Sequence, residues 1–194
     1  MMTTHKQATQ FFSTIAGLFA SKGELQYGES VNQLQHALQC GHRAEQDGAS
    51  EAMVVAAVFH DIGHMIHRDA SHAVSAGRDD HHEALGARWL ERAFSKSVTE
   101  PIRLHVQAKR YLCLREPAYA QALSDLSRRT LKLQGGPMSL QEALDFEASP
   151  YSMEAVQLRR WDDMGKLAHM NTPGLDHFLS KARELCVFTQ SPSN

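Results

Sequence analysis

The chain has 194 residues and a formal net charge of −2, from 20 Lys and Arg residues against 22 Asp and Glu residues. Because the two signs are interspersed and no basic run occurs, the composition speaks against nucleic acid or an anionic membrane surface as a partner and favours small molecules. Three cysteines far apart in the sequence do not suggest a disulfide framework, so we expect a cytoplasmic protein with one domain and an ordinary core.

The first predicted helix covers about residues 4–21. Its bulky apolar residues recur at helical spacing and polar residues interrupt them, which favours an amphipathic helix over a secretory signal. Ser30 and Gln33 match a capping box for a second helix that extends to about Glu45. His36 lies on this helix just outside its apolar arc, a position that is also compatible with the protein surface.

The most apolar stretch, residues 52–59, leads directly into His60 and Asp61. Ser50 can cap this helix, and Gly63 is predicted to help end it. A buried carboxylate needs a neutralising partner, because an unpaired buried charge is strongly unfavourable. A metal cation is one such partner; the alternative is that both side chains bond to local backbone at the end of a helix.

Residues 65–77 show no clear period and are predicted to form an irregular loop over the candidate site. A helix is predicted from about residue 78 to residue 94, because apolar residues recur along one stripe of it. His82 belongs to this stripe and faces inward, whereas the neighbouring His81 does not.

A further helix is predicted to begin at residues 99–101, because proline is favoured in a first turn. On this helix His105 and Lys109 share a face, so an imidazole and an ammonium point the same way. Lys109 could instead be an ordinary surface lysine. Residues 117–133 are expected to form another helical region, and residues 139–142 match a capping box for a short helix.

Two more helices are predicted, one from Ser152 and one after Pro173. The first of them places Asp162 on its inward side. Arg159 could contribute to a site or simply pair with Asp163 at i,i+4 spacing. No segment alternates convincingly as a strand and no repeat is visible, so the sequence predicts an all-α fold.

Several candidate metal ligands lie on different helices or helix ends, without a thiolate among them: His36, His60, Asp61, His82, His105 and Asp162. Four imidazoles and two carboxylates suit iron, manganese or another borderline-to-hard metal better than a structural zinc site. Each histidine alone could be an ordinary core or surface residue. As a set, the six side chains exceed the need of one ion, so we expect a dinuclear centre with Asp61 as its bridge.

The order His, His-Asp, His, His, Asp resembles the HD-domain superfamily, and within it the mixed-valent di-iron oxygenases that cleave phosphonates, from about residue 27 to residue 166. The resemblance implies an HD-domain helical bundle over residues 1–194, with a dinuclear metal site in a core at about residues 27–170. It implies one iron held by His36, His60, Asp61 and Asp162, and a second iron, in the other oxidation state, held by Asp61, His82 and His105.

The resemblance also implies catalytic and substrate-binding residues. Tyr27 and Glu29 match a Tyr/Glu pair in which the tyrosine occupies the second iron until substrate displaces it. His64, Lys109 and Arg159 match residues that line the substrate phosphonate, and the first two of these are also expected to take part in catalysis.

The implied reaction is cleavage of a C–P bond by O2. A 1-hydroxy-2-(trimethylammonio)ethylphosphonate would give glycine betaine and phosphate, or the primary-amine analogue would give glycine and phosphate. The partners would be this hydroxyphosphonate and O2, without nucleic acid or membrane, for a monomer or homodimer. The alternative is a metal-dependent HD phosphohydrolase that acts on a nucleotide or small phosphate ester, and a metal-binding regulator is a third reading. A coupled Fe(II)/Fe(III) signal supports the oxygenase; Mn or Mg dependence without O2 consumption supports the hydrolase.

Overall fold

The computed structural model of the chain describes residues 4–27, 30–67 and 76–189, so most of the predicted loop over residues 65–77 lies outside them. Within the described ranges the regular structure is helical apart from two short antiparallel strands, and the all-α prediction is confirmed. The elements are α1 (Thr4–Lys22), β1 (Gln26–Tyr27), β2 (Val31–Asn32), α2 (Gln33–Gln46), α3 (Glu51–Phe59), α4 (Ile62–Ile66), α6 (His82–Leu90), α7 (Lys96–Arg115), α8 (Pro117–Ala122), α9 (Asp125–Leu133), α10 (Leu140–Glu147), α11 (Ser152–Met164), α12 (Leu175–Glu184) and the 3₁₀ helix η1 (Val187–Thr189).

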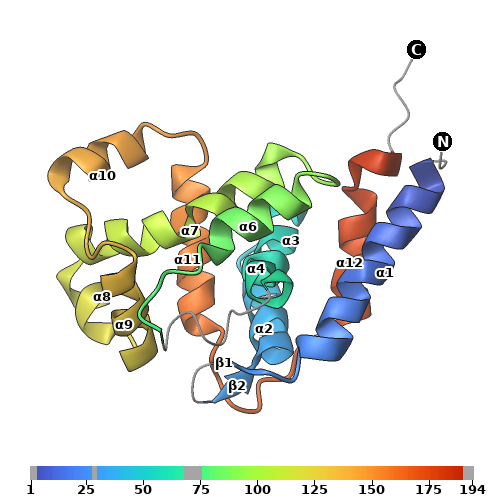
Figure 1. Cartoon of the computed structure of the whole chain (residues 1–194), viewed down its shortest axis with the longest axis horizontal. Coiled ribbons are helices and arrows are strands. Elements are labelled where there is room, and N and C mark those ends of the chain that lie inside the picture. Colours follow the sequence, from blue (N-terminus) through green and yellow to red (C-terminus); the bar gives the residue numbers. More distant parts are fainter. Residues whose placement is uncertain (1–3, 28–29, 68–75, 190–194) are drawn as a thin grey trace.

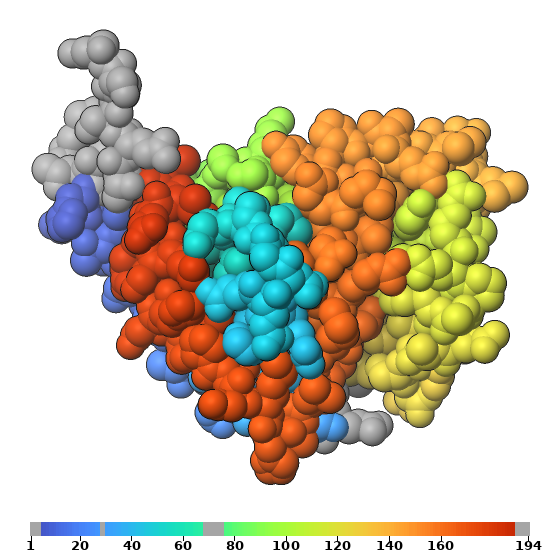
Figure 2. Space-filling view, turned by 180° about the vertical axis from the view of Figure 1, so that it is seen from behind, coloured from blue at the N-terminus to red at the C-terminus, as the bar shows by residue number. Residues whose placement is uncertain are grey.

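The long helix α7 runs through the molecule and packs against α3, α6 and α11. Figure 1 shows α1 and α12 side by side at one end of the molecule, and α8, α9 and α10 gathered at the other end. From behind, the turn between α2 and α3 reaches the surface between the segments of α12 and α11 (Figure 2). The helices α2, α3, α7 and α11 therefore form the centre, where side chains from distant parts of the sequence meet.

The main hydrophobic core surrounds α3. Every residue from Met53 to Phe59 is buried, which explains why this helix is apolar on all sides. Helix α1 covers part of this core with Phe11, Ile15 and Phe19, as its amphipathic pattern predicted. No helix in the described ranges combines the length and the apolar character that crossing a bilayer requires.

The two caps nearest the core differ in how well they were predicted. Ser50 caps α3, with its side chain accepting from the backbone N–H of Met53. The capping box of α2 is formed by Asn32 and Gln35, two residues later than predicted. The shift arises because the backbone pairs as strand β2 through residue 32, and strands of two residues show no alternation that a sequence could reveal.

Helix α6 is shorter than the predicted segment 78–94. His81, just before it, is in the left-handed region with φ 48°. Asp79 and Asp80 accept long hydrogen bonds from the backbone N–H groups of His81 and His82, both at 3.4 Å. These local bonds take the place of an earlier helical turn. His82 is buried and His81 is exposed, as predicted.

Two boundaries in the second half of the chain also differ from the prediction. Helix α7 begins at Lys96, so Pro101 lies inside the helix and not in its first turn. Pro101 lacks a backbone N–H, so α7 loses one hydrogen bond near its N-terminus, and the rest of this long helix is unaffected. The region 117–133 is divided into α8 and α9, because the Ser124 side chain accepts a backbone hydrogen bond and starts a new helix.

Gly63 was predicted to end α3, and this is wrong, because it lies inside α4. Its role is close packing: a Cβ atom at this position would lie only 1.9 Å from the carbonyl oxygen of His82. Gly86 of α6 faces it, since a Cβ there would lie 3.1 Å from the Gly63 nitrogen. The two glycines thus let α4 approach α6, which brings Asp61 close to His82.

We expect Gly63→Ala to lower the free energy of unfolding by about 3 kcal/mol or more, because the methyl group must displace backbone and not a flexible side chain. The matched control is Gly17→Ala in α1, where a Cβ would meet nothing within 4 Å. That change should be neutral or stabilising by about 0.5–1 kcal/mol. Urea unfolding of both variants measures the difference, and equal stability would show that α4 can move away from α6 at little cost.

Candidate functional site

The first group of candidate ligands lies where α2, the end of α3 and α11 meet. His36 Nε2 is 3.3 Å from His60 Nε2 and 3.4 Å from Asp162 Oδ1. Asp61 Oδ2 is 3.4 Å from His60 Nε2 and 3.7 Å from His36 Nε2. Two ligands of one ion, each about 2.1 Å from it, lie about 3 to 4 Å apart, so these four atoms are spaced to share an ion. His36 is fully buried, and the surface position that the sequence left open for it is wrong.

The second group shares Asp61 with the first. His82 Nε2 lies 3.2 Å from His105 Nε2 and 3.3 Å from Asp61 Oδ1, and His105 Nε2 lies 3.7 Å from the same oxygen. The two oxygens of Asp61 therefore face different groups. All six side chains singled out from the sequence come together, in the arrangement that a bridging carboxylate between two ions requires.

The other ring nitrogen of each histidine faces an oxygen that accepts a hydrogen bond. These contacts are His36 Nδ1 to Gly165 O at 2.9 Å, His60 Nδ1 to Ala57 O at 2.8 Å, His82 Nδ1 to Asp80 Oδ1 at 2.9 Å and His105 Nδ1 to Ile102 O at 2.7 Å. The acceptors hold a proton on each Nδ1, so the Nε2 lone pairs are free to face the centre of each group, as in metal-binding histidines. Asp61 Oδ2 is buried without a hydrogen-bond donor among the described residues.

The carboxylates of the site attract positive charge. Burial alone would lower the pKa of His82, but hydrogen bonds to Asp61 and Asp80 override it and raise that pKa to about 10. Burial dominates at His105 and holds its pKa well below the usual value, with the positive charge of His82 adding to the effect. The pKa values of these two neighbouring rings are thus shifted in opposite directions. Metal cations satisfy the carboxylates and the imidazole lone pairs together, so the donor set fits a dinuclear metal centre.

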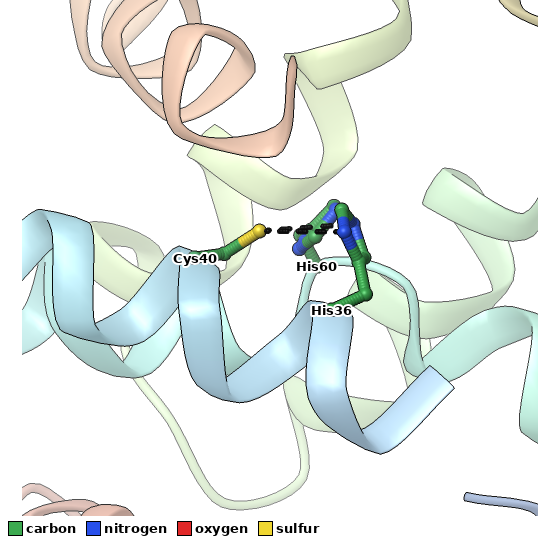
Figure 3. A group of neighbouring side chains, drawn as sticks. All are labelled: His36, Cys40 and His60. Carbon is green, nitrogen blue, oxygen red and sulfur yellow. Dashed lines mark hydrogen bonds between the residues drawn. The ribbon is translucent and has the colours of Figure 1, made fainter. Parts of the chain in front are cut away.

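Cys40 lies one helical turn after His36, beside the first group (Figure 3). Its Sγ is 3.6 Å from Nε2 and 3.8 Å from Nδ1 of His36, so it does not lie along the lone pair of either nitrogen. Burial, with the charge of Asp162 next in importance, holds the pKa of the thiol well above its usual value. We therefore expect Cys40 to pack against the ligands as a neutral thiol. Cys40 was not among the residues singled out from the sequence, although its i,i+4 spacing from His36 was a signal of proximity.

A cavity of about 560 Å³ opens beside the ligand groups. Its lining brings together predicted catalytic and substrate-binding residues from separate elements, Tyr27, His64, Lys109 and Arg159, and it also includes Ser127 and Thr130 of α9. The region of α9 was predicted as helical but its place at the cavity was not, because short polar residues on an amphipathic helix carry no distinctive pattern. Glu29, the other predicted catalytic residue, lies outside the described residues.

Lys109 is only 3% exposed, so the alternative of a surface lysine is wrong. Its Nζ donates a hydrogen bond to Thr130 Oγ1 at 3.1 Å. Burial, reinforced by the charge of Arg159, lowers the pKa of Lys109 to about 8. A buried ammonium with a neutral partner at the wall of a cavity is suited to meet an anionic ligand group.

Arg159 makes the predicted i,i+4 pair with Asp163, and it also holds a ligand of the first group. Its Nη1 donates to Asp162 Oδ2 and its Nη2 to Asp163 Oδ1, both at 2.5 Å. Its Nε contacts the hydroxyl of Tyr119 at 2.9 Å. The guanidinium thus orients Asp162 at the same time as it lines the cavity.

Tyr27 stacks on His36 with ring centroids 3.8 Å apart and donates from its hydroxyl to Asp162 Oδ1 at 3.3 Å. This contact lies at the first ligand group, whereas the family resemblance assigned the tyrosine to the second iron. His64 stacks on His82 with centroids 3.9 Å apart. Its Nε2 lies 4.0 Å from Asp61 Oδ1, so His64 adjoins the second group.

Comparison with known proteins found related sequences, whereas no family model matches the chain. A [1-hydroxy-2-(trimethylamino)ethyl]phosphonate dioxygenase (glycine-betaine-forming) of Leisingera caerulea is 41% identical over 165 residues, which cover 84% of each chain. A hydroxymethylphosphonate dioxygenase of Gimesia maris is 40% identical over 190 residues, covering 96% of this chain and 93% of the relative. An uncharacterised protein of Acanthamoeba polyphaga mimivirus is 35% identical over 176 residues, covering 89% of this chain and 80% of the relative.

Proposed function

This chain belongs to the family of the phosphonate dioxygenases, and we propose that it cleaves the C–P bond of a 1-hydroxyphosphonate with O2 at a mixed-valent dinuclear iron centre. The observation that carries the proposal is the carboxylate of Asp61, whose oxygens face two separate groups of ligands beside a cavity with the buried ammonium of Lys109. In the proposed assignment the HD-type metal-binding core extends over about residues 27–170. His36, His60, Asp61 and Asp162 hold one iron, and Asp61, His82 and His105 hold the other.

The proposed substrate is 1-hydroxy-2-(trimethylammonio)ethylphosphonate, which with one O2 gives glycine betaine and phosphate. This assignment follows the name of the Leisingera relative. It is compatible with the cavity of about 560 Å³, which has room for a trimethylammonium group as well as a phosphonate. Hydroxymethylphosphonate, the substrate in the name of the Gimesia relative, is the second candidate, and it lacks the nitrogen-bearing carbon.

When bound, the iron ions would bind O2 and supply the oxidation of the hydroxyl-bearing carbon. The acidic and basic side chains of the site cannot supply this oxidation themselves. The residues of the chain position the substrate. Lys109 binds the phosphonate, whose negative charge compensates the positive charge of the buried ammonium; the hydroxyl of Thr130, its hydrogen-bond partner, is neutral. His64 lies at the cavity wall beside Asp61 and helps to hold the substrate near the second group.

The function is tested by supplying the iron-loaded protein with (R)-1-hydroxy-2-(trimethylammonio)ethylphosphonate, with its primary-amine analogue and with hydroxymethylphosphonate. Each compound is supplied under air and under nitrogen. We expect O2-dependent phosphate release, fastest from the trimethylammonio compound, with one O2 consumed per phosphate. Preference for another hydroxyphosphonate would overturn the substrate assignment alone. Phosphate release from a nucleotide or a simple phosphate ester under nitrogen, with none from the phosphonates, would establish the hydrolase alternative.

A further inference from the structure

Asp80 lies just before α6 with its side chain only 4% exposed, and each of its oxygens faces a different imidazole. Oδ1 accepts a hydrogen bond from His82 Nδ1–H at 2.9 Å. Oδ2 lies 2.7 Å from His64 Nδ1, in a contact that is close but not aligned as a hydrogen bond. One carboxylate therefore contacts two histidines with different positions in the site.

The two imidazoles are held side by side. Their rings stack with centroids 3.9 Å apart and an interplanar angle of 18°. At the opposite edge, His82 Nε2 is 3.3 Å and His64 Nε2 is 4.0 Å from Asp61 Oδ1. The rings thus lie between the carboxylates of Asp61 in front and Asp80 behind.

The two rings differ in what they can reach. His82 is nearly buried and faces His105 across the second ligand group. The His64 side chain is 24% exposed and lines the cavity, so a bound molecule can touch it. A change in the position of Asp80 would move both rings, because their stacking leaves neither free to turn alone.

We propose that Asp80 is a positioning residue that holds His82 on the second metal ion and His64 against the substrate through a single carboxylate. The metal half of this inference requires only that His82 binds a metal ion. The substrate half rests on the proposed function. Affinity for the second ion and for the substrate therefore depend on the same side chain.

The test is Asp80→Asn, compared with Asp79→Asn as a matched control. Asp79 Oδ2 lies 3.2 Å from Nδ1 of the exposed His81, so the control removes a similar Asp–His pair whose histidine belongs to neither ligand group. An asparagine has no charge, one acceptor oxygen and an amide that donates, so it cannot present an acceptor oxygen to both imidazoles. We expect the affinity for one of two Fe(II) ions to fall about 10- to 100-fold in Asp80→Asn, with the other ion retained. Asp79→Asn should bind both ions as the wild type does.

The link between the two rings is tested with His64→Ala and the double variant. In Asp80→Asn we expect a raised KM for the hydroxyphosphonate. The double variant with Asp80→Asn and His64→Ala should have nearly the KM of His64→Ala alone, because both changes remove the same contact of His64 with the substrate. His64→Ala alone should leave the affinity for both ions within a fewfold of the wild-type value. Additive effects on KM would overturn the substrate half.

Binding of two ions at wild-type affinity by Asp80→Asn would overturn the metal half. If Asp80→Asn does not fold, Asp80→Glu keeps the charge but moves the carboxylate by one methylene, and it should give the same selective loss of one ion. Wild-type protein that binds two ions but releases no phosphate from any hydroxyphosphonate refutes the proposed function and with it the substrate half. The metal half is then still decided by the affinities.

Discussion

Asp61→Asn is expected to remove both metal ions and, with them, the O2-dependent release of phosphate. The reason is that its two oxygens face different groups: Oδ2 lies 3.4 Å from His60 Nε2, and Oδ1 lies 3.3 Å from His82 Nε2. An amide keeps only one oxygen and no charge, and its NH2 would face imidazole lone pairs on one side. Loss of a group that merely supports a ligand costs about 10- to 100-fold in metal affinity, so loss of the shared ligand should cost more than about 100-fold at both sites.

One-sided variants are the controls for this result. His105→Ala should lose the second ion and keep the first, because His105 Nε2 faces His82 and Asp61 Oδ1 in the second group. Asp162→Asn should show the reverse pattern, since Asp162 Oδ1 faces His36 and His60. Iron per chain after desalting, followed by chelator competition, measures all three. An Asp61→Asn protein that keeps one ion at wild-type affinity would show that Asp61 serves a single group.

The sequence predicted which of the candidate ligands face the centre, except for His36, because the others are histidines or aspartates on the inward side of a helix or at its end. For example, His82 and His81 are neighbours, and the apolar stripe alone decided which one is buried. Helical periodicity needs only local information, so it survives errors of several residues in the helix boundaries. The start of α7 at Lys96 illustrates this: the prediction was wrong by three residues, yet His105 faces the centre.

Interactions between segments were not predictable in the same way. Asp80 was read as part of a helix start, but its contacts with His64 and His82 depend on how α4 packs against α6. The close approach at Gly63 has the same origin, because a glycine near a helix end looks like a stop signal unless the neighbouring helix is known. Residues that join two segments therefore carry the part of the site that the periodic pattern could not reveal.

The Lys109 side chain shows this limit most clearly, because the sequence could not decide between a substrate residue and a surface lysine. In the structure it is buried, which lowers its pKa from the usual 10.5 to about 8. This difference means that holding the ammonium costs the folded protein about 3 kcal/mol. Its hydrogen bond to Thr130 returns about 1 kcal/mol. A lysine kept at such a cost is more consistent with function than with stability.

Lys109→Met is therefore expected to make the metal-free protein about 2 kcal/mol more stable at pH 7, because methionine fills a similar volume without a charge. The gain should be full below pH 8 and shrink as pH rises towards 10.5, since the wild-type lysine then becomes neutral in the folded and in the unfolded protein. Urea unfolding at pH 7 and pH 10 measures the change. The matched control is Lys132→Met, an exposed lysine of α9, which should alter neither stability nor activity.

The same Lys109→Met change is expected to lower kcat/KM for the hydroxyphosphonate about 100- to 1000-fold. An ammonium about 4 Å from a phosphonate oxygen contributes about 4 kcal/mol at an effective dielectric constant of about 20. In the wild type, KM should rise above pH 8 as the ammonium loses its proton, and KM of the variant should lack this pH dependence. The neighbouring charge of Arg159 opposes the charge on Lys109, whereas Asp162, Asp163 and Asp61 favour it. Loss of stability together with activity would make Lys109 a structural residue, and a more stable variant with unchanged kcat/KM would show that the phosphonate binds elsewhere in the cavity.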